Sequence, residues 1–208
     1  MYKSRIAIIG AGAMGGAIAD GILARGVIPA ANLIISNHTP GRLERFAQSG
    51  AVLTTDNREA VAQADWVILA VKPWLVESVL KGIKDVLDYK QQTLVVVAAG
   101  VSSESIKTWL DKGGQMIPTF LVIPNIAIAQ LQSMTFVVPV GTEAVTQRTE
   151  QVKTLFDSMG KTIITEESHL VAGTTLASCG IAYAMRYIRA ASEGGVELGF
   201  KADEAKQI

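Results

Sequence analysis

The chain has 208 residues, enough for one large domain or for one domain with an appendage. Lysine and arginine together number 19, as do aspartate and glutamate, and this balance argues against a polyanionic partner such as nucleic acid. The single cysteine cannot form an internal disulfide, and the sequence has neither a secretory signal nor an apolar run of about 18 residues, so we expect a cytoplasmic protein with no membrane partner.

An N-terminal apolar run, Ile6 to Ile9, is followed by a glycine-rich turn and then by a helical pattern. Glycines spaced Gly-x-Gly-x-x-Gly between a strand and a helix are typical of a dinucleotide-binding turn. The first glycine permits a sharp bend, the second leaves room for a pyrophosphate, and the third lets the helix pack on the strand. A purely structural turn is the alternative. We predict that the cofactor pyrophosphate binds along Gly10, Ala11, Gly12, Ala13, Met14 and Gly15.

The residues after the second expected strand, Asn32 to Ser36, bear on the choice of cofactor. An acidic side chain there would accept hydrogen bonds from the ribose hydroxyls and repel a 2′-phosphate. The sequence instead has Asn37, His38 and Thr39, followed shortly by Arg42. Polar side chains with one or two cations suit a phosphate, so we predict NADP, with NAD left open. For His38 an ordinary polar turn is the alternative.

Strand and helix patterns alternate through the next hundred residues. This alternation predicts a Rossmann-type α/β fold, a doubly wound and mostly parallel sheet of seven or eight strands. The expected strands after the second are at 51–53, 66–71, 93–98, 116–117 with 120–123, 135–140 and 161–165, and the expected helices are at 40–48, 57–64, 74–84, 103–111 and 142–158.

Two strand ends carry further candidate residues. Lys72 and Pro73 follow the strand that ends near Val71, at the sheet edge where doubly wound sheets bind ligands. A lysine there can reach a phosphate, a ribose or a carboxylate. Ala98 and Ala99 close the next strand, and such small side chains let a ligand lie close to the backbone.

The composition changes near Ser168 to small and apolar residues. We place a dinucleotide-binding domain at 1–166 and the start of a helical domain at 167–208. An apolar helix from Gly173 to Leu198 must be buried against something, which predicts a homodimer or higher homo-oligomer through this helix. Cys179 is expected to be a packed, inert thiol, and no metal site is predicted because the two histidines lack partners at ligand spacing.

The order of several motifs resembles that of the pyrroline-5-carboxylate reductase family. The matching segments are GAGAMGGAI near the N-terminus, AVKP at 70–73, AAGVS at 98–102, IPN at 123–125, and GTTLASCGIAYAM followed by EGGVELGFKADEA. The resemblance implies NAD(P)H-dependent reduction of the cyclic imine 1-pyrroline-5-carboxylate to L-proline, in proline biosynthesis. It also implies a Rossmann domain followed by a helical domain that interlocks with a second subunit.

The resemblance further implies residue roles along the cofactor. Asn37 and Thr39 would flank the ribose phosphate, and Asn57 would lie on the adenosine side. The remaining implied contacts are Ala70, Val71, Lys72, Pro73, Ala98 and Ala99 along the cofactor, with Asn125 near the nicotinamide. No residue is singled out as catalytic, because hydride transfer to a C=N bond needs little acid chemistry from the protein.

The sequence departs from the family pattern in its second half. The family's Arg-x-Met-Pro-Asn-Thr-Pro motif corresponds to a segment with Leu121 at the arginine, and with Ile126 and Ala127 at the threonine and proline. The sequence ends at Ile208, before the family's Gly-Gly-Thr-Thr segment, so we expect a truncated helical domain. Two alternatives follow: a related reductase of another small imine or carbonyl, and a non-catalytic dinucleotide-binding module.

Overall fold

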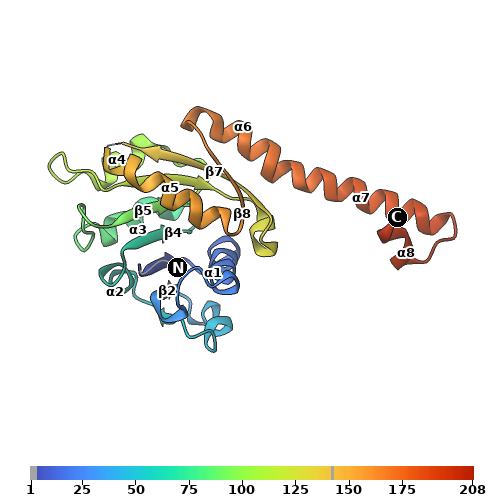
Figure 1. Cartoon of the computed structure of the whole chain (residues 1–208), viewed down its shortest axis with the longest axis horizontal. Coiled ribbons are helices and arrows are strands. Elements are labelled where there is room, and N and C mark those ends of the chain that lie inside the picture. Colours follow the sequence, from blue (N-terminus) through green and yellow to red (C-terminus); the bar gives the residue numbers. More distant parts are fainter. Residues whose placement is uncertain (1–3, 142) are drawn as a thin grey trace. The chain divides into compact units, whose positions relative to one another are not determined.

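The computed structural model describes residues 4–141 and 143–208. It comprises two compact units, the first extending to Leu170 and the second from Val171 to Ile208. Figure 1 shows the first unit as a sheet covered by helices and the second as a succession of helices. Each unit is described by itself below.

The first unit is built on an eight-stranded sheet of order β3-β2-β1-β4-β5-β6-β7-β8. All neighbouring strands are parallel except β6 and β7, which are antiparallel. Their connection, residues 124–132, is shorter than the dozen or so residues that a parallel crossover requires. The predicted Rossmann-type, mostly parallel sheet is confirmed. The strands are β1 (Ile6–Ile9), β2 (Leu33–Ser36), β3 (Val52–Thr54), β4 (Trp66–Leu69), β5 (Thr93–Val96), β6 (Thr119–Ile123), β7 (Ser133–Val140) and β8 (Gly160–Ile164).

The central strands are apolar on both faces because helices cover both sides of the sheet. On β1, Ile6 and Ile8 point into one core, and Ala7 and Ile9 point into the other. Two helices bury residues in the first core: α1 (Ala13–Arg25) and α5 (Glu143–Asp157). Three helices bury residues in the second: α2 (Asn57–Ala62), α3 (Val76–Ile83) and α4 (Ser103–Leu110).

Local signals in the sequence set several helix ends. The carboxylate of Asp56 caps α2 by accepting from the backbone N–H groups of Arg58 and Glu59. Ser102 caps α4 in the same way, and Gly26 ends α1 in the left-handed conformation, with φ of 58°. The starts of α2 and α4 agree with the helices expected from residues 57 and 103.

Three expected elements are different in the structure. Residues 40–48 do not form an α-helix but two 3₁₀ turns, Pro40–Arg42 and Glu44–Phe46. The buried residues Leu43 and Phe46 are three positions apart, which matches the period of a 3₁₀ turn. A further 3₁₀ turn, Pro73–Leu75, precedes α3, and β6 begins at Thr119, so the expected strand piece at 116–117 is absent.

The second unit is helical and contains most of the expected long helix. That helix is interrupted, because α6 (Leu170–Thr174) passes through a π turn at Thr175–Cys179 before α7 (Gly180–Glu197). The last helix, α8 (Ala202–Gln207), packs on α7 and buries Ala205. Its first turn is closed by Glu204 Oε2, which accepts from the Lys201 backbone N–H at 3.0 Å. Across the two described ranges, no helix is long and apolar enough to cross a membrane.

Candidate functional site

The main cleft of the first unit has a volume of about 500 Å³ and opens at the carboxyl ends of β1, β2 and β4. The chain leaves β1 toward β2 on one side and later returns to β4 on the other, so β1 and β4 form the topological switch point of the sheet. Ligands of doubly wound sheets bind at this position. The lining residues are Ile9, Gly10, Gly12, Ala13, Met14, Asn37, His38, Thr39, Arg42, Asn57, Ala70, Val71, Lys72, Leu75, Val79, Val97 and Ile126.

Two of the three fingerprint glycines are required by packing within the protein. Gly10 has φ of 103°, and a Cβ atom there would lie 2.7 Å from the carbonyl oxygen of Ala70. A Cβ atom on Gly15 would lie 1.9 Å from the carbonyl oxygen of Gly10. Both residues therefore have a structural reason to be glycine, namely the close approach of α1, the turn and β4.

Gly12 has no such reason. It is the N-cap of α1 in an extended conformation, with φ of −72°, and no described atom beyond its own two chain neighbours lies within 4 Å of the position of a Cβ atom. No side chain caps α1 in the described structure. The N–H groups of its first turn thus remain available at the cleft, which Gly12, Ala13 and Met14 line. A helix N-terminus in this position, with space left open in front of it, suits an anionic phosphate.

Asn37 at the end of β2 is buried and serves the turn itself. Its side-chain Oδ1 accepts from the Ala11 backbone N–H at 3.1 Å, and its Nδ2 donates to the Thr39 carbonyl at 3.1 Å. Beside it, the hydroxyl of Ser36 and the side chain of Asn57 are 2.7 Å apart. Asn37 and Asn57, both predicted to contact the cofactor, line the cleft, and these hydrogen bonds hold protein groups in place.

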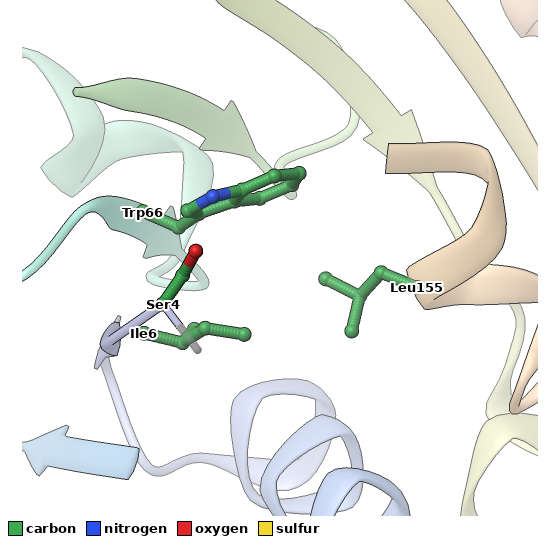
Figure 2. A pocket seen from close by; sticks show the side chains of 4 residues that line it. All are labelled: Ser4, Ile6, Trp66 and Leu155. Carbon is green, nitrogen blue, oxygen red and sulfur yellow. The ribbon is translucent and has the colours of Figure 1, made fainter. Parts of the chain in front are cut away.

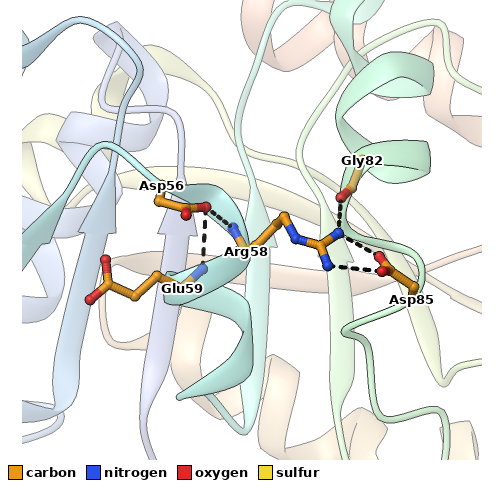
Figure 3. Close-up of polar contacts among 5 residues, drawn as sticks. All are labelled: Asp56, Arg58, Glu59, Gly82 and Asp85. Carbon is orange, nitrogen blue, oxygen red and sulfur yellow. Dashed lines mark hydrogen bonds and ion pairs between the residues drawn. The ribbon is translucent and has the colours of Figure 1, made fainter.

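A shallower groove between α2 and α3 continues from the cleft, with Asn57 and Val79 lining both. Figure 3 shows the guanidinium of Arg58 extending from α2 to the C-terminal end of α3. It donates to both carboxylate oxygens of Asp85, at 2.6 and 2.8 Å, and to the Gly82 carbonyl at 2.9 Å. This hydrogen bonding holds the pKa of Asp85 below its ordinary value and raises the pKa of Arg58. The pair is exposed, and it links the two helices that form the groove.

The other part of the cleft is lined mostly by apolar residues. Ala70 and Val71 follow β4, Val97 follows β5, and Ile126 follows the Pro124-Asn125 turn. Lys72 is the cation here, and its Nζ lies 5.9 Å from the centre of the exposed Trp74 ring. An apolar lining with few polar groups suits a flat ring that must be held away from water.

Six predicted residues do not line the cleft. Ala11 and Gly15 are buried in the glycine turn, Pro73 starts a 3₁₀ turn, and Ala98 is buried beside the exposed Ala99. Asn125 is 5% exposed, and its side chain accepts from the Ala127 N–H, which caps the turn at Ile126–Gln130.

Several lining residues were missing from the prediction. The apolar ones are Ile9, Leu75, Val79, Val97 and Ile126, and their sequence context is that of core residues, which gives no signal of a cleft. Arg42 also lines the cleft. From the sequence it was noted only as a cation near Thr39, because the sequence does not show which way its side chain points.

A second, much smaller depression lies at the opposite, amino-terminal edge of the sheet. Figure 2 shows it between Ser4, Ile6, Trp66 and Leu155. Its volume of about 10 Å³ is close to that of a single water-sized probe. This depression is too small for an organic ligand. Among the described residues, no group of three His, Cys, Asp or Glu side chains is arranged to hold a metal ion.

The fold, the switch-point cleft and the open helix N-terminus together define a Rossmann-type dinucleotide-binding protein. Residues 5–100 match the family model described as NADP oxidoreductase, coenzyme F420-dependent. Residues 167–208 match the model for pyrroline-5-carboxylate reductase dimerisation.

Curated proteins and solved structures that are called pyrroline-5-carboxylate reductases align with nearly the whole chain. Pyrroline-5-carboxylate reductase 1 of Dictyostelium discoideum is 31% identical over 100% of this chain and 39% of its own length. Pyrroline-5-carboxylate reductase 3 of Danio rerio is 30% identical over 100% of this chain and 70% of its own length. The chain therefore spans only part of these relatives.

Two solved structures are also similar. The pyrroline-5-carboxylate reductase of Coxiella burnetii has a TM-score of 0.87 at 26% identity, covering 99% of this chain and 75% of that one. The Plasmodium falciparum pyrroline carboxylate reductase, solved with NADP bound, has a TM-score of 0.87 at 21% identity, covering 100% and 74%, and shows the same fold. The chain belongs to the pyrroline-5-carboxylate reductase family. The predicted family and the predicted NAD(P)H-dependent oxidoreductase class are confirmed, and NADP is the cofactor that the oxidoreductase model names.

Proposed function

We propose that this chain reduces 1-pyrroline-5-carboxylate to L-proline with NADPH, as a reductase of proline biosynthesis. The relatives of that name, which align with the whole chain, support the substrate. The single observation that carries the cofactor assignment is Gly12. Packing within the protein does not require glycine there, whereas a pyrophosphate approaching the start of α1 does.

The lining residues fit a dinucleotide, and each part of the cleft has a role in the proposal. The backbone from Gly10 to Gly15 would hold the pyrophosphate against the N-terminus of α1. Asn57 would lie on the adenosine side, with His38 and Thr39 at the ribose. Ala70 to Pro73 would lie along the cofactor, and Ala98, Ala99 and Asn125 would support the nicotinamide end.

When bound there, the nicotinamide supplies the hydride for the C=N carbon. The protein's own residues contribute orientation and the exclusion of water. Val97 and Ile126 give the cleft an apolar wall, and the N-terminus of α1 stabilises the negative charge of the cofactor. An iminium substrate is already electrophilic, so no proton donor is assigned.

A second candidate is a reductase of another small imine or carbonyl. Ile126 supports it, because this residue lines the cleft and is 55% exposed at the position where the family motif has threonine. Leu121, at the motif's arginine position, is buried in β6 and provides no cation. These two substitutions favour a more apolar substrate.

The test is oxidation of NADPH by the purified chain with 1-pyrroline-5-carboxylate, followed by a panel of more apolar cyclic imines and small carbonyls. Turnover of the first compound supports the main proposal, and turnover of the panel alone supports the second candidate. A Gly12→Ala variant is the matched control, because it should keep its melting temperature and lose turnover. NADPH binding without any turnover would contradict both enzymatic proposals and indicate a binding module.

We also propose that residues 167–208 join two or more copies of the chain, each acting in the reducing cytoplasm. Large apolar side chains of the second unit are exposed, including Tyr183 and Tyr187 at more than 70%. A dimerisation model matches the same residues. Cys179 was expected to be packed, but its thiol is free and exposed within this chain, because α7 and the π turn before it bury no residue here. A free thiol is consistent with a reducing compartment.

A further inference from the structure

The last segment of the first unit is bonded to the start of α4, at the end of a loop beside the cleft. Glu167 lies in a 3₁₀ turn, Glu167–His169, just before this unit ends at Leu170. Its Oε1 accepts from the Ser103 backbone N–H at 2.9 Å, although 64 positions separate the two residues. Glu167 is also the first residue of the region that matches the dimerisation model. The bond therefore ties the start of that region to the start of α4.

Ser103 is the first residue of α4, and its N–H is one of the donors that a helix start leaves unpaired. The Ser102 hydroxyl caps α4 by accepting from the Ser105 N–H, so the Ser103 N–H is left for Glu167. A carboxylate is favoured here both by the charge-assisted hydrogen bond and by the positive end of the helix dipole. Glu167 thus supplies a second cap from a distant part of the chain.

The loop between β5 and α4 depends on its two ends. At its start, Val97 lines the cleft, and the Val97 N–H donates to the Leu69 carbonyl at 2.8 Å. Among the described residues, the backbone groups of 98–101 form no hydrogen bond with another backbone group. At its other end the loop continues into Ser103, which Glu167 holds. The position of the loop beside the cleft therefore depends on the contact with Glu167.

The segment around Glu167 is itself fixed to the first unit. The Thr165 backbone N–H donates to the Val137 carbonyl at 2.9 Å, and the Thr165 hydroxyl and His169 Nδ1 are 3.0 Å apart. The side chain of Leu170 packs against the second core. Glu167 lies between these anchored residues, so its carboxylate gives the start of α4 a fixed support.

We propose that Glu167 is a positioning residue for the nicotinamide end of the cofactor, because it holds the α4 end of the loop that follows β5. This inference rests on the proposed function, in which Ala98 and Ala99 of that loop support the nicotinamide. Glu167 acts through Ser103 and makes no contact with the cofactor itself. The adenosine end lies beside β2, which β1 and β4 separate from β5 in the sheet, so adenosine binding does not depend on Glu167.

The test compares NADPH with adenosine 2′,5′-bisphosphate, a probe that has the adenosine end and lacks the nicotinamide. Calorimetry measures the binding of each to the full chain. Glu167→Ala should weaken NADPH binding about 10-fold and leave the bisphosphate unchanged, because NADPH must then supply the order that the charge-assisted hydrogen bond gave the loop. Glu167→Gln keeps the acceptor oxygen and should lose about threefold. The fluorescence of bound NADPH, which reports the surroundings of the nicotinamide, should shift toward that of free NADPH in Glu167→Ala.

Ser103→Pro tests the same bond from its donor side. Proline is tolerated at the first position of a helix and has no N–H, so this change removes the donor and keeps α4. Ser102 already has the extended backbone, with ψ of 153°, that a residue before proline prefers. Ser103→Pro should weaken NADPH binding as Glu167→Ala does, and the double variant should be no weaker than either single variant. Additive losses would show that the two residues act separately and would overturn the inference.

Glu166→Ala is the matched control, because it removes an exposed carboxylate one position earlier that caps no N–H group. It should leave the binding of both ligands unchanged. The inference is wrong if Glu167→Ala binds NADPH as tightly as the wild type, or if it weakens NADPH and the bisphosphate equally, as a general loss of structure would. A wild-type chain that binds no NADPH would overturn both this inference and the proposed cofactor. A chain that shows the expected effects on binding but reduces no imine would support the inference and contradict only the proposed reaction.

Discussion

The two units of this chain differ in how far their own residues bury their apolar side chains. In the first unit, two cores sandwich the sheet, and strands such as β1 and β4 are buried throughout. In the second unit, α7 has no buried residue, and Tyr183, Met185 and Ile188 are all more than half exposed. The first unit completes its hydrophobic core internally, and the second requires a surface from elsewhere.

Helix geometry makes this requirement specific. Tyr183 and Tyr187 are four residues apart and share one face of α7, whereas Met185 is about 200° away from Tyr183 around the helix axis. A helix with apolar side chains on opposite faces needs cover on more than one side. An interlocked partner satisfies this need better than a single flat contact.

The largest expected effect comes from removing this apolar surface. A double variant, Tyr183→Glu with Met185→Glu, should weaken self-association by about four orders of magnitude, because each side chain contributes about 1.5 kcal/mol of burial and occurs in both protomers. Sedimentation or light scattering over a concentration series measures this. Ala47→Glu with Gln48→Glu adds the same charges on an exposed turn of the first unit and should leave association unchanged. A wild-type chain that is monomeric at all concentrations would contradict the proposed role of the second unit.

The next effect concerns the dense packing of the first unit. Gly15→Ala would place a methyl group 1.9 Å from the Gly10 carbonyl oxygen, so α1 or the turn must move. We expect a loss of about 3 kcal/mol, or a melting temperature lower by about 10 °C, together with loss of NADPH binding. Gly12→Ala, where no described atom beyond the two chain neighbours lies within 4 Å of the added methyl group, should lose binding at nearly unchanged melting temperature. Equal melting of the two variants would show that the turn is less tightly packed than the structure indicates.

The smallest effect concerns the exposed ion pair between α2 and α3. Since Arg58 lowers the pKa of Asp85 in the folded state, this carboxylate stabilises the fold above its unfolded pKa of about 3.9, and the contribution is lost as pH falls through the folded value. Asp85→Asn should therefore lower the melting temperature slightly at pH 7, and this difference should shrink as the pH falls below about 3.9. Glu77→Gln, which breaks a pair within α3 alone, is the control. A difference from wild type that persists at the lowest pH would exclude the ion pair as its cause.

Most strands and helices of the first unit follow from local patterns. The apolar run Ile6 to Ile9 requires burial on both faces, and Asp56 before Arg58 and Glu59 gives a capped helix start without help from the rest of the fold. Residues 40–48 were mispredicted because a helical pattern and a pair of 3₁₀ turns differ only in the spacing of two buried residues. Tertiary packing of Leu43 and Phe46 selected the tighter turns.

In the cleft, too, some features follow from local sequence and others from tertiary packing. The sequence by itself determined the glycine turn, the strand ends that border the cleft and the lack of an acidic residue after β2, because each depends on residue type at a fixed place along the chain. Only the tertiary structure decided that Asn37 bonds to the turn while Arg42 lines the cleft, and that Gly12 alone of the three glycines faces open space. Those facts depend on which atoms of distant segments come close to Asn37, Arg42 and Gly12 in the folded chain. A local sequence pattern does not specify such contacts.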